Sequence, residues 1–523
     1  MFKKALLAVF SVLVVLTFSS PALAETKVLF KGHYRVRYWY KNNLNLAHLQ
    51  KQETKSTYFD HRLRLSLSFH PSEVLSMNIS TQVNKDQKWG NQKSGMDWSH
   101  KADTDASAVM PVDPGDPTKG YYLQQGTRDV NGIWDNGVEV YRLYMTILTP
   151  YGMFDVGRLS SGEAGLTVFG YYGGPFHEDQ APFCSEAPSD SLVYTIKVDN
   201  FILRAQFEKL AEVDSLNGEY DSDADVYEII PVYTFDGGGF KGAVNCLFAW
   251  MRDRSGTLSF NSNFTNDPAP AGVIYNAAGL LAMSDSAAGR VNGIAALNGA
   301  TLDLFNIWPA AQLEVGPWAF RTTFRYVTGR FKPSDAGGST YRKIEVSGFG
   351  FYADATYSYG AGMAGLSYIY LQGDKTEKNK RFNPFDTPGE ERTKRLDNII
   401  GSGVDYCPLL VAYDVELDTV GLNDQPNHWS LVAWWDHAVT EELMVHAAYG
   451  YVYINNVPKN VKHDYGHEVD AGLKASIYGN AHFTTQFGYF IAGKYHRGAK
   501  VAGNYANKIN NGWIWKNELI LSF

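Results

Sequence analysis

A chain of 523 residues with 49 glycines and 14% aromatic side chains suits one large antiparallel sheet, because no linker, charge block or shift in composition divides it. Its formal net charge of −8 argues against nucleic-acid binding. No run of 18 apolar residues follows residue 24, which excludes a membrane protein built from helices.

The first 24 residues have the pattern of a secretory signal peptide. Lys3 and Lys4 give a positive start, residues 5–18 are almost continuously apolar, and residues 22–24 form a small-x-small cleavage site. The apolar run is short for an anchoring helix, and Pro21 follows it. We therefore expect residues 1–24 to be removed and residues 25–523 to form the mature protein.

From residue 30 onward the sequence alternates with a period of two. In segment 33–40, Tyr34, Val36 and Tyr38 fall on one face, whereas Arg35 and Arg37 fall on the other. Segments 59–69, 318–327, 443–453 and 467–478 alternate in the same way. One such segment also fits a soluble β-sandwich. Many of them behind a signal peptide, with no helical stretch between, predict strands that separate lipid from water.

Short and long connections alternate along the chain, which predicts the topology. Eight short connections rich in Gly, Pro, Asn or Asp suit tight turns, and they lie at 70–73, 149–152, 197–200, 236–239, 314–317, 357–362, 437–442 and 478–480. Nine longer polar connections lie near 41–56, 85–136, 159–190, 210–224, 252–300, 329–343, 373–427, 455–464 and 493–511. Together they predict an all-β fold, a transmembrane antiparallel β-barrel of about 18 strands, with 16 or 20 as alternatives. The nine long loops would then be extracellular and both termini periplasmic. The strands within 300–360 and 400–436 are the least clearly marked.

The last predicted strand is amphipathic and reaches the C-terminal residue. Trp513, Trp515, Leu519 and Leu521 share a face with Phe523. A terminal strand of this kind resembles the signal that outer-membrane barrels present to their assembly machinery. The resemblance implies that this machinery is a partner and that the bacterial outer membrane is the location.

A second resemblance covers residues 28–170. Two Arg-x-Arg pairs lie at 35–37 and 62–64, and Gly157-Arg158 follows a short strand. These features resemble the opening strands of Gram-negative outer-membrane porin-type β-barrels, either general porins or 18-strand alginate-export-like barrels. The resemblance implies a porin-like channel with an arginine-rich lumen, and beyond residue 170 the chain matches only in architecture.

Alternation assigns a set of charged side chains to the lumen. The predicted pore-lining residues are Arg35, Arg37, Arg62, Arg64, Arg142, Arg158, Arg204, Arg321, Arg325, Glu468 and Asp470. Arg158 faces inward only if a one-residue bulge lies near Asp155. Arginine stays charged and binds carboxylate or phosphate through two parallel hydrogen bonds, so a basic wall would favour anions. The alternative is that lumen charges only solvate the wall and pair with one another. Because the last and first strands are neighbours in a closed barrel, acidic and basic walls are expected to meet there.

A loop folded into the lumen is expected to constrict the channel. The candidate is 159–190, which is rich in Gly and aromatic residues and holds Glu163, Glu186 and Asp190, placed to face the arginines. The loop 85–136, with three Trp residues, is the rival. Loops of this length are usually functional or disordered.

The sequence contains no pattern typical of a cofactor, metal or nucleophile site. Cys184, Cys246 and Cys407 are the only cysteines, and no CxxC, GxSxG or HExxH occurs. A Cys184–Cys407 disulfide is chemically allowed in an oxidising compartment. We expect no cofactor, no metal ion and no enzymatic activity.

The sequence therefore predicts an outer-membrane porin-like channel for the diffusion of small hydrophilic, preferentially anionic, solutes. The alternatives are a dedicated export or uptake pore for an acidic polysaccharide or organic acid, and a structural barrel that sheathes a redox partner. Expected partners are outer-membrane lipid and lipopolysaccharide, the barrel-assembly machinery through Phe523, and small hydrophilic solutes. A homotrimer and a monomer both stay open.

Overall fold

The computed structural model describes the strands of one large sheet and short segments beside them. The described residues are 27–44, 46, 55–88, 138–160, 188–211, 224–254, 260–261, 273–275, 281–283, 301–332, 344–372, 381–382, 395–396, 428–455, 457, 461–497, 500–501, 504–505 and 509–523. The predicted signal peptide lies outside them. Within these ranges, no helix is long and apolar enough to cross a membrane.

Eighteen long strands make up the barrel wall in the described chain, and one short strand, β17 (Arg381–Phe382), joins the same sheet. The long strands are β1 (Lys27–Asn42), β2 (Lys55–Ser72), β3 (Leu75–Lys88), β4 (Val138–Thr149), β5 (Gly152–Ser160), β6 (Pro188–Val198), β7 (Phe201–Ala211), β8 (Ala224–Gly237), β9 (Phe240–Asp253), β13 (Thr301–Val315), β14 (Trp318–Lys332), β15 (Ile344–Tyr359), β16 (Gly362–Leu371), β19 (His428–Ala438), β20 (Leu443–Ile454), β21 (Asp464–Tyr478), β22 (Ala481–Ala492) and β25 (Gly512–Ser522). Short strands lie outside this set: β10 (Phe260–Asn261), β11 (Val273–Tyr275), β12 (Leu281–Met283), β17 (Arg381–Phe382), β18 (Arg395–Leu396), β23 (Lys500–Val501) and β24 (Asn504–Tyr505).

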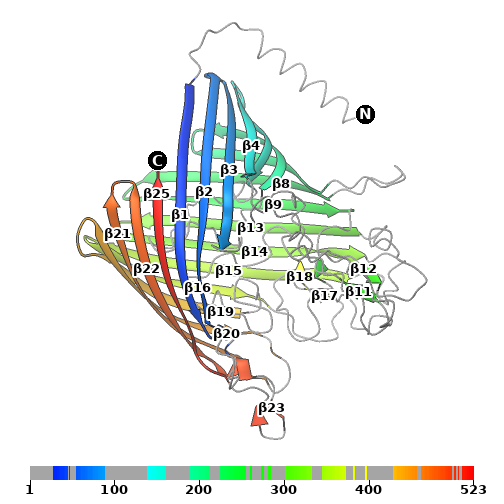
Figure 1. Ribbon diagram of the computed structural model, residues 1–523. Helices are drawn as coiled ribbons and strands as arrows, with labels where there is room; N and C mark the ends of the chain where they lie inside the picture. Colours follow the sequence, from blue (N-terminus) through cyan, green and yellow to red (C-terminus); the bar gives the residue numbers. More distant parts are fainter. Residues whose placement is uncertain are drawn as a thin grey trace, which may run out of the picture.

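The long strands form a closed antiparallel barrel. Each pairs with its neighbours in chain order, and β25 pairs with β1 to close the sheet. At this seam Val36 lies opposite Leu519, and the backbone of Gly32 exchanges two hydrogen bonds with Phe523. Figure 1 shows the blue β1 and the red β25 side by side. The predicted 18-strand barrel is confirmed for the described chain, including the weakly marked region 300–360, which forms β13, β14 and β15.

Eight tight turns lie at one end of this barrel, here named the turn end. Each leaves two to four residues between paired strands, and all eight coincide with the predicted short connections. Asp199, Gly238 and Gly316 adopt positive φ angles of 50°, 65° and 55° in three of these turns, a conformation that Gly and Asp tolerate. The longer connections join strands at the opposite end, here named the loop end, as the sequence predicted.

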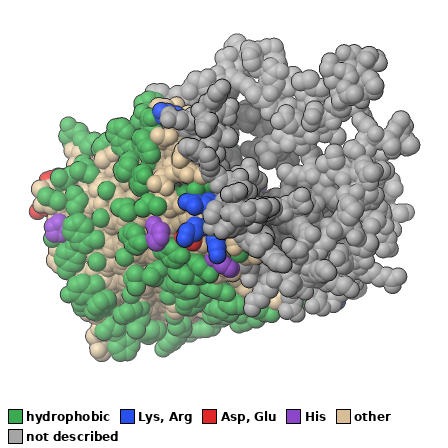
Figure 2. Space-filling model, turned by 90° about the horizontal axis from the view of Figure 1, so that it is seen from below, with side chains coloured by type: hydrophobic (Ala, Val, Ile, Leu, Met, Phe, Trp, Pro, Cys, Tyr) green, Lys and Arg blue, Asp and Glu red, His purple; other side chains and the backbone are tan. Residues whose placement is uncertain are grey.

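The two faces of the sheet differ in the chemistry of their side chains. Alternate residues along the strands are exposed and apolar on the outer face, for example Phe305, Trp318 and Leu519, while the residues between them are buried and often polar. Figure 2 shows hydrophobic side chains covering the outer surface that is visible from below, and Lys and Arg gathered beside the part drawn in grey. The predicted alternation of apolar and polar faces is therefore confirmed.

An apolar cluster lies on the inner face towards the loop end. Its buried members are Trp39, Leu44, Leu46, Val432, Trp434, Ala448, Val452, Ile454, Tyr465, Phe490 and Ile514. Leu46 is tied over this cluster, because its amide donates to the carbonyl of Asn43 at 3.0 Å and its carbonyl accepts from the amide of Asn510 at 2.9 Å. The 3-10 helix η5 (Lys494–Arg497) covers the same region, and the buried His496 ring lies 4.4 Å from the Tyr465 ring between centroids.

Candidate functional site

Arginines gather on the inner face of β1 and β2. Arg35 lies directly opposite Arg62, and Arg64 lies opposite His33, because the two strands pair without a register shift. Arg37 continues the same face towards the loop end. The sequence predicted this face from the alternation, and pairing of the two Arg-x-Arg segments places their cationic side chains side by side.

Trp39 is the centre of a group of cations that the sequence did not reveal. The Arg37 guanidinium carbon and the Lys41 and Lys516 ammonium nitrogens lie 5.1, 4.8 and 5.4 Å from the centroid of its ring. Asp60 holds the group together: Oδ1 accepts from Arg37 Nε at 2.8 Å, and Oδ2 accepts from the Trp39 indole N–H at 2.7 Å. Cation–π contacts contribute about 0.5–2 kcal/mol each, and the carboxylate offsets the repulsion among the cations. The sequence alone could only indicate that Trp39 lies on the same face of its strand as Arg35 and Arg37.

The barrel seam brings acidic and basic residues together, as expected from closure. Glu518 of β25 lies opposite Arg37 in register. Its carboxylate lies 3.9 Å from Arg35 Nε and 3.6 Å from Lys516 Nζ. The Arg35–Glu518 contact joins residues almost 500 positions apart in the chain, so only a closed sheet can form it.

This wall nevertheless keeps an excess of positive charge. Between the levels of His33 and Lys41, six permanent cations face inward on β25, β1 and β2, namely Arg35, Arg37, Lys41, Arg62, Arg64 and Lys516. The facing carboxylates over the same stretch are Asp60 and Glu518, which leaves a formal charge of +4. The seam wall, defined by these eight residues, is the most basic part of the described inner face.

Two further predicted arginines lie on the inner face of neighbouring strands. Arg142 lies opposite Ser80, next to a bulge in the β3–β4 pairing, and shares a face with Thr146. Arg204 of β7 lies opposite Ile230 of β8, whose side chain is almost fully buried. Both arginines therefore face inward, and both are half-buried.

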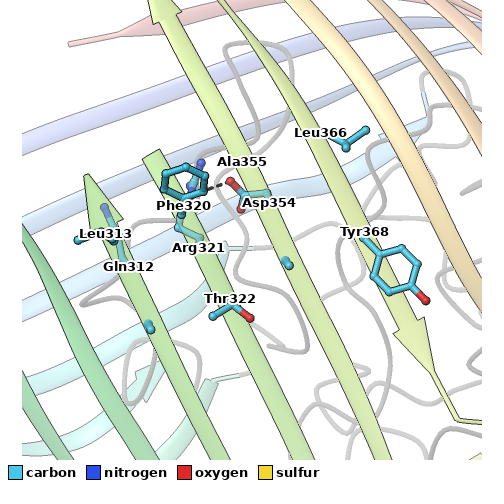
Figure 3. A pocket seen from close by; sticks show the side chains of 11 residues that line it. Gln312, Leu313, Phe320, Arg321, Thr322, Asp354, Ala355, Leu366 and Tyr368 are labelled. Carbon is cyan, nitrogen blue, oxygen red and sulfur yellow. Dashed lines mark hydrogen bonds and ion pairs between the residues drawn. The ribbon is translucent and has the colours of Figure 1, made fainter. Parts of the chain in front are cut away.

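Arg321 and Arg325 are held by partners on adjacent strands. Arg321 Nε lies 3.2 Å from Asp354 Oδ1, and Figure 3 marks this contact between β14 and β15. Arg325 Nε donates to Asn306 Oδ1 at 3.2 Å, and its guanidinium lies 5.0 Å from the centre of the Trp308 ring. On this side of the barrel, the arginines bind partners within the wall and do not form an open basic surface.

The late strands carry acidic groups on the same inner face. Glu468 and Asp470 are buried on β21, opposite Gly450 and Ala448 of β20. A neighbouring pair was not predicted: His446 Nδ1 lies 2.6 Å from Asp436 Oδ1, and both side chains are buried. Alternation in segment 443–453 predicts that His446 faces inward, but its partner Asp436 lies at the end of 400–436, one of the regions in which strands were hardest to assign.

Arg158 and Asp190 lie on the outer face, which corrects their predicted placement. β5 pairs with β4 and β6 without a register shift, so the bulge needed near Asp155 is absent there. Asp155 faces inward and accepts a hydrogen bond from the Thr146 hydroxyl at 2.6 Å, while Arg158 faces outward beside the exposed Leu143. Asp190 belongs to β6 rather than to a loop, and it forms a 3.7 Å ion pair with Arg158.

The predicted constriction lies outside the described residues. Glu163 and Glu186 fall in this part of the chain, as do most of the rival loop and the cysteines Cys184 and Cys407. Cys246 is described and is a free thiol on β9. No group of three or more His, Cys, Asp or Glu side chains that could hold a metal ion occurs among the described residues.

A shallow apolar groove of about 390 Å³ lies along β13 to β16 (Figure 3). Its lining includes Leu313, Phe320 and Leu366, which are exposed on the outer face. Their cross-strand neighbour Ala355 is small and leaves the hollow between them. The groove is therefore part of the apolar outer belt and not of the charged interior.

The fold and the distribution of side chains define a transmembrane β-barrel. In the described chain, the 18 long strands pair with one another around the full circle, so the barrel wall leaves no open edge to the hydrocarbon. Most side chains on the outer face between the two ends are apolar, whereas Arg35, Glu468 and Asp470 face inward, which is the architecture of bacterial outer-membrane barrels. The predicted location in the outer membrane agrees with this architecture.

Comparison with known proteins gives similar barrels only among solved structures. No protein-family model and no curated protein matches the chain. The OccAB1 protein of Acinetobacter baumannii is similar with a TM-score of 0.44 and 10% identity, over 95% of this chain and 96% of that one. OccK5 of Pseudomonas aeruginosa has a TM-score of 0.43 and 11% identity over 94% and 97%. The outer-membrane protein OmpT of Vibrio cholerae, in a trimer form, has a TM-score of 0.39 and 11% identity over 95% and 99%. At these identities and TM-scores the similarities carry nothing about solute or mechanism.

Proposed function

We propose that this barrel is an outer-membrane channel for small hydrophilic solutes and that it prefers anions. The observation that carries this proposal is the formal charge of +4 on the seam wall. Elsewhere on the inner face, Asp354 holds the charge of Arg321. An anion in the lumen would therefore meet its strongest attraction along β25, β1 and β2.

The chemistry of the seam wall supports a preference that does not depend on pH near neutrality. Arginine remains charged throughout this range and offers a planar fork of donors to carboxylates and phosphates. Fixed charges of one sign raise the local concentration of the opposite ion and speed its entry. Because the Debye length falls from about 8 Å at physiological salt to about 3 Å at 1 M, the preference should weaken as salt rises.

Ion selectivity in a planar bilayer tests this proposal. We expect the reversal potential in a KCl gradient to show chloride preference, and the triple variant Arg35→Gln/Arg62→Gln/Arg64→Gln to move it towards zero selectivity. The triple change lowers the formal charge of the seam wall from +4 to +1. Arg330→Gln, on the outer face of β14, is the matched control and should leave the reversal potential unchanged. Cation preference in the unmodified protein, or the absence of any conductance, would overturn the proposal.

Swelling of liposomes in sugars of graded size separates the alternatives. A general channel should admit sugars according to size alone. A dedicated pore for an acidic polysaccharide or organic acid should admit few neutral sugars but conduct its own anion, and a sheathing barrel should admit none without its partner. We expect size-graded entry and no enzymatic turnover.

The other expected partners belong to the same proposal. Phe523 ends the closing strand beside Gly32 of β1, with its ring 6.0 Å from the Phe30 ring between centroids. This position suits recognition by the barrel-assembly machinery before the seam closes. Lipopolysaccharide would surround the loop end.

A further inference from the structure

A row of alternating charges crosses seven neighbouring strands at the loop end. Arg158, Asp190 and Lys209 lie directly opposite one another on β5, β6 and β7. The row continues through Asp225, Arg252, Asp303 and Arg330 on β8, β9, β13 and β14, again in direct register. These seven residues are here named the charge row. The strand registers, and not proximity in sequence, bring them to one level.

The charge row lies on the outer face of the barrel. Each member lies on the same face of the sheet as exposed apolar residues of its own strand or of a paired strand. Leu143 lies beside Arg158 in this way, and Phe305 beside Asp303. Two residues nearer the turn end, four rings form a parallel row, with successive centroids 5.3, 5.3 and 6.3 Å apart: Phe207, Tyr227, Trp250 and Phe305. Aromatic belts mark the boundary between hydrocarbon and headgroups. The charge row therefore lies just beyond the hydrocarbon, at headgroup level.

The contacts along the charge row leave cations in excess. Lys209 Nζ lies 3.0 Å from Asp225 Oδ1. Asp303 serves two arginines, with Arg254 at 2.8 Å and Arg330 at 3.8 Å, and Arg252 lies opposite it in register. Around these two carboxylates stand Lys209, Arg252, Arg254 and Arg330, which gives a formal charge of +2. The Arg330 side chain is 53% exposed, so part of its guanidinium faces outward.

We propose that the charge row binds the phosphate groups of glycolipids in the outer leaflet. Arginine guanidiniums bind phosphate through two parallel charge-assisted hydrogen bonds, and three of them converge at Asp303. The ligand must lie beside the barrel at headgroup depth, where lipid phosphates are found and free solutes are not concentrated. The inference is independent of channel function and needs only that the barrel spans the membrane.

The shape of the charge row favours lipid over a second copy of this chain. The row follows the curved wall over seven of 18 strands. Two cylinders in contact share only a few strands, whereas a shell of lipids follows the whole arc. Alternating signs also suit lipid phosphates bridged by divalent cations, because each carboxylate can take a cation while each arginine takes a phosphate.

Binding of lipid A to the detergent-solubilised protein tests the proposal. The probes are bisphosphorylated lipid A and the same lipid after enzymatic removal of its phosphates, with native mass spectrometry or fluorescence titration as readout. We expect the unmodified protein to bind the phosphorylated form at least about tenfold more tightly, which one lost charge-assisted phosphate contact would account for. The variant Arg252→Gln/Arg254→Gln/Arg330→Gln should lose this difference.

Controls separate lipid recognition from folding and from free-anion binding. Lys241→Gln removes a cation at the turn end, 2.8 Å from Glu314, and should bind lipid A normally. Arg330→Lys keeps the charge but not the fork, and should fall between the two. The proposal is overturned if the triple variant retains heat-modifiable electrophoretic mobility and binds phosphorylated lipid A normally, if dephosphorylation has no effect, or if millimolar inorganic phosphate displaces the lipid.

Discussion

Asp60 binds both Trp39 and one of the three cations that surround its ring. Its two oxygens hold the Arg37 side chain and the indole N–H, so one carboxylate fixes both the charge and the ring. Trp39 is 8% exposed, which means that the ring is part of the wall and offers little surface to a solute. The Trp39 ring instead holds the ammonium groups of Lys41 and Lys516 against the wall, in the half of the seam wall nearer the loop end.

Asp60→Asn should increase the anion preference of the channel. The change removes one of the two carboxylates on the seam wall, so its formal charge rises from +4 to +5. Loss of the charged acceptor should also lower the free energy of unfolding by about 1–3 kcal/mol. Reversal potentials and thermal unfolding measure the two effects. Asp303→Asn removes a carboxylate from the outer face and is the control; equal shifts in selectivity from both variants would contradict the assignment of the wall.

The helix η5 is the described element whose attachment is expected to depend on pH. His496 is buried beneath Tyr465, Phe490 and Tyr495, and this burial lowers its pKa to about 3. Around it, Lys494 and Arg497 of the same helix are exposed, and Asp464 of β21 accepts from the Lys494 amide at 3.4 Å. The helix therefore docks through the uncharged ring of His496, and its two cationic side chains, Lys494 and Arg497, stay exposed.

Docking of η5 should weaken as the pH falls below about 6.5. The folded pKa of His496 lies below its ordinary value of 6.5, so the undocked form binds the proton more readily. Docking is at full strength above 6.5, and its equilibrium constant should fall about tenfold per pH unit between 6.5 and 3. Hydrogen exchange of the amides in 494–497, corrected for the intrinsic rate, measures this change. His496→Phe should remove the dependence; an equal dependence in that variant would refute it.

Closure gives the whole molecule its most basic wall. Arg35 and Glu518 lie at opposite ends of the chain, and β25 must reach β1 before the seam wall exists. The remaining 17 strand pairs form from neighbours in sequence. The last pairing therefore creates both the membrane-spanning cylinder and the charge distribution proposed to select anions.

A disulfide across the seam should report closure directly. Val36 and Leu519 face each other in an antiparallel pair, whose Cα separation of about 4.5–5.5 Å suits a disulfide. With the three native cysteines replaced by Ser, Val36→Cys/Leu519→Cys should form a bond on mild oxidation and shift the electrophoretic mobility of the heated protein. Val36→Cys/Trp515→Cys is the control, because Trp515 lies opposite Tyr40. Efficient cross-linking of the control pair, or failure of the first, would contradict this register.

The sequence by itself determined the strands, the turns and the faces. Side chains alternate with period two along a strand, so Tyr34 and Arg35 were assigned to opposite faces without any tertiary information. Tight turns need particular residues, so the eight hairpins were also predictable. The exception was Arg158: alternation assigns a face only relative to a register, and the assumed bulge was absent.

Only the tertiary structure decided which charges meet across strands. Register joins residues far apart in sequence, and no local pattern encodes it. Trp39 with its cations, the Asp436–His446 pair and the outer charge row therefore became visible only when the strands were paired. The residues of one strand determine which side chains face lipid and which face the lumen. The register with the neighbouring strands determines which of these charged side chains come into contact.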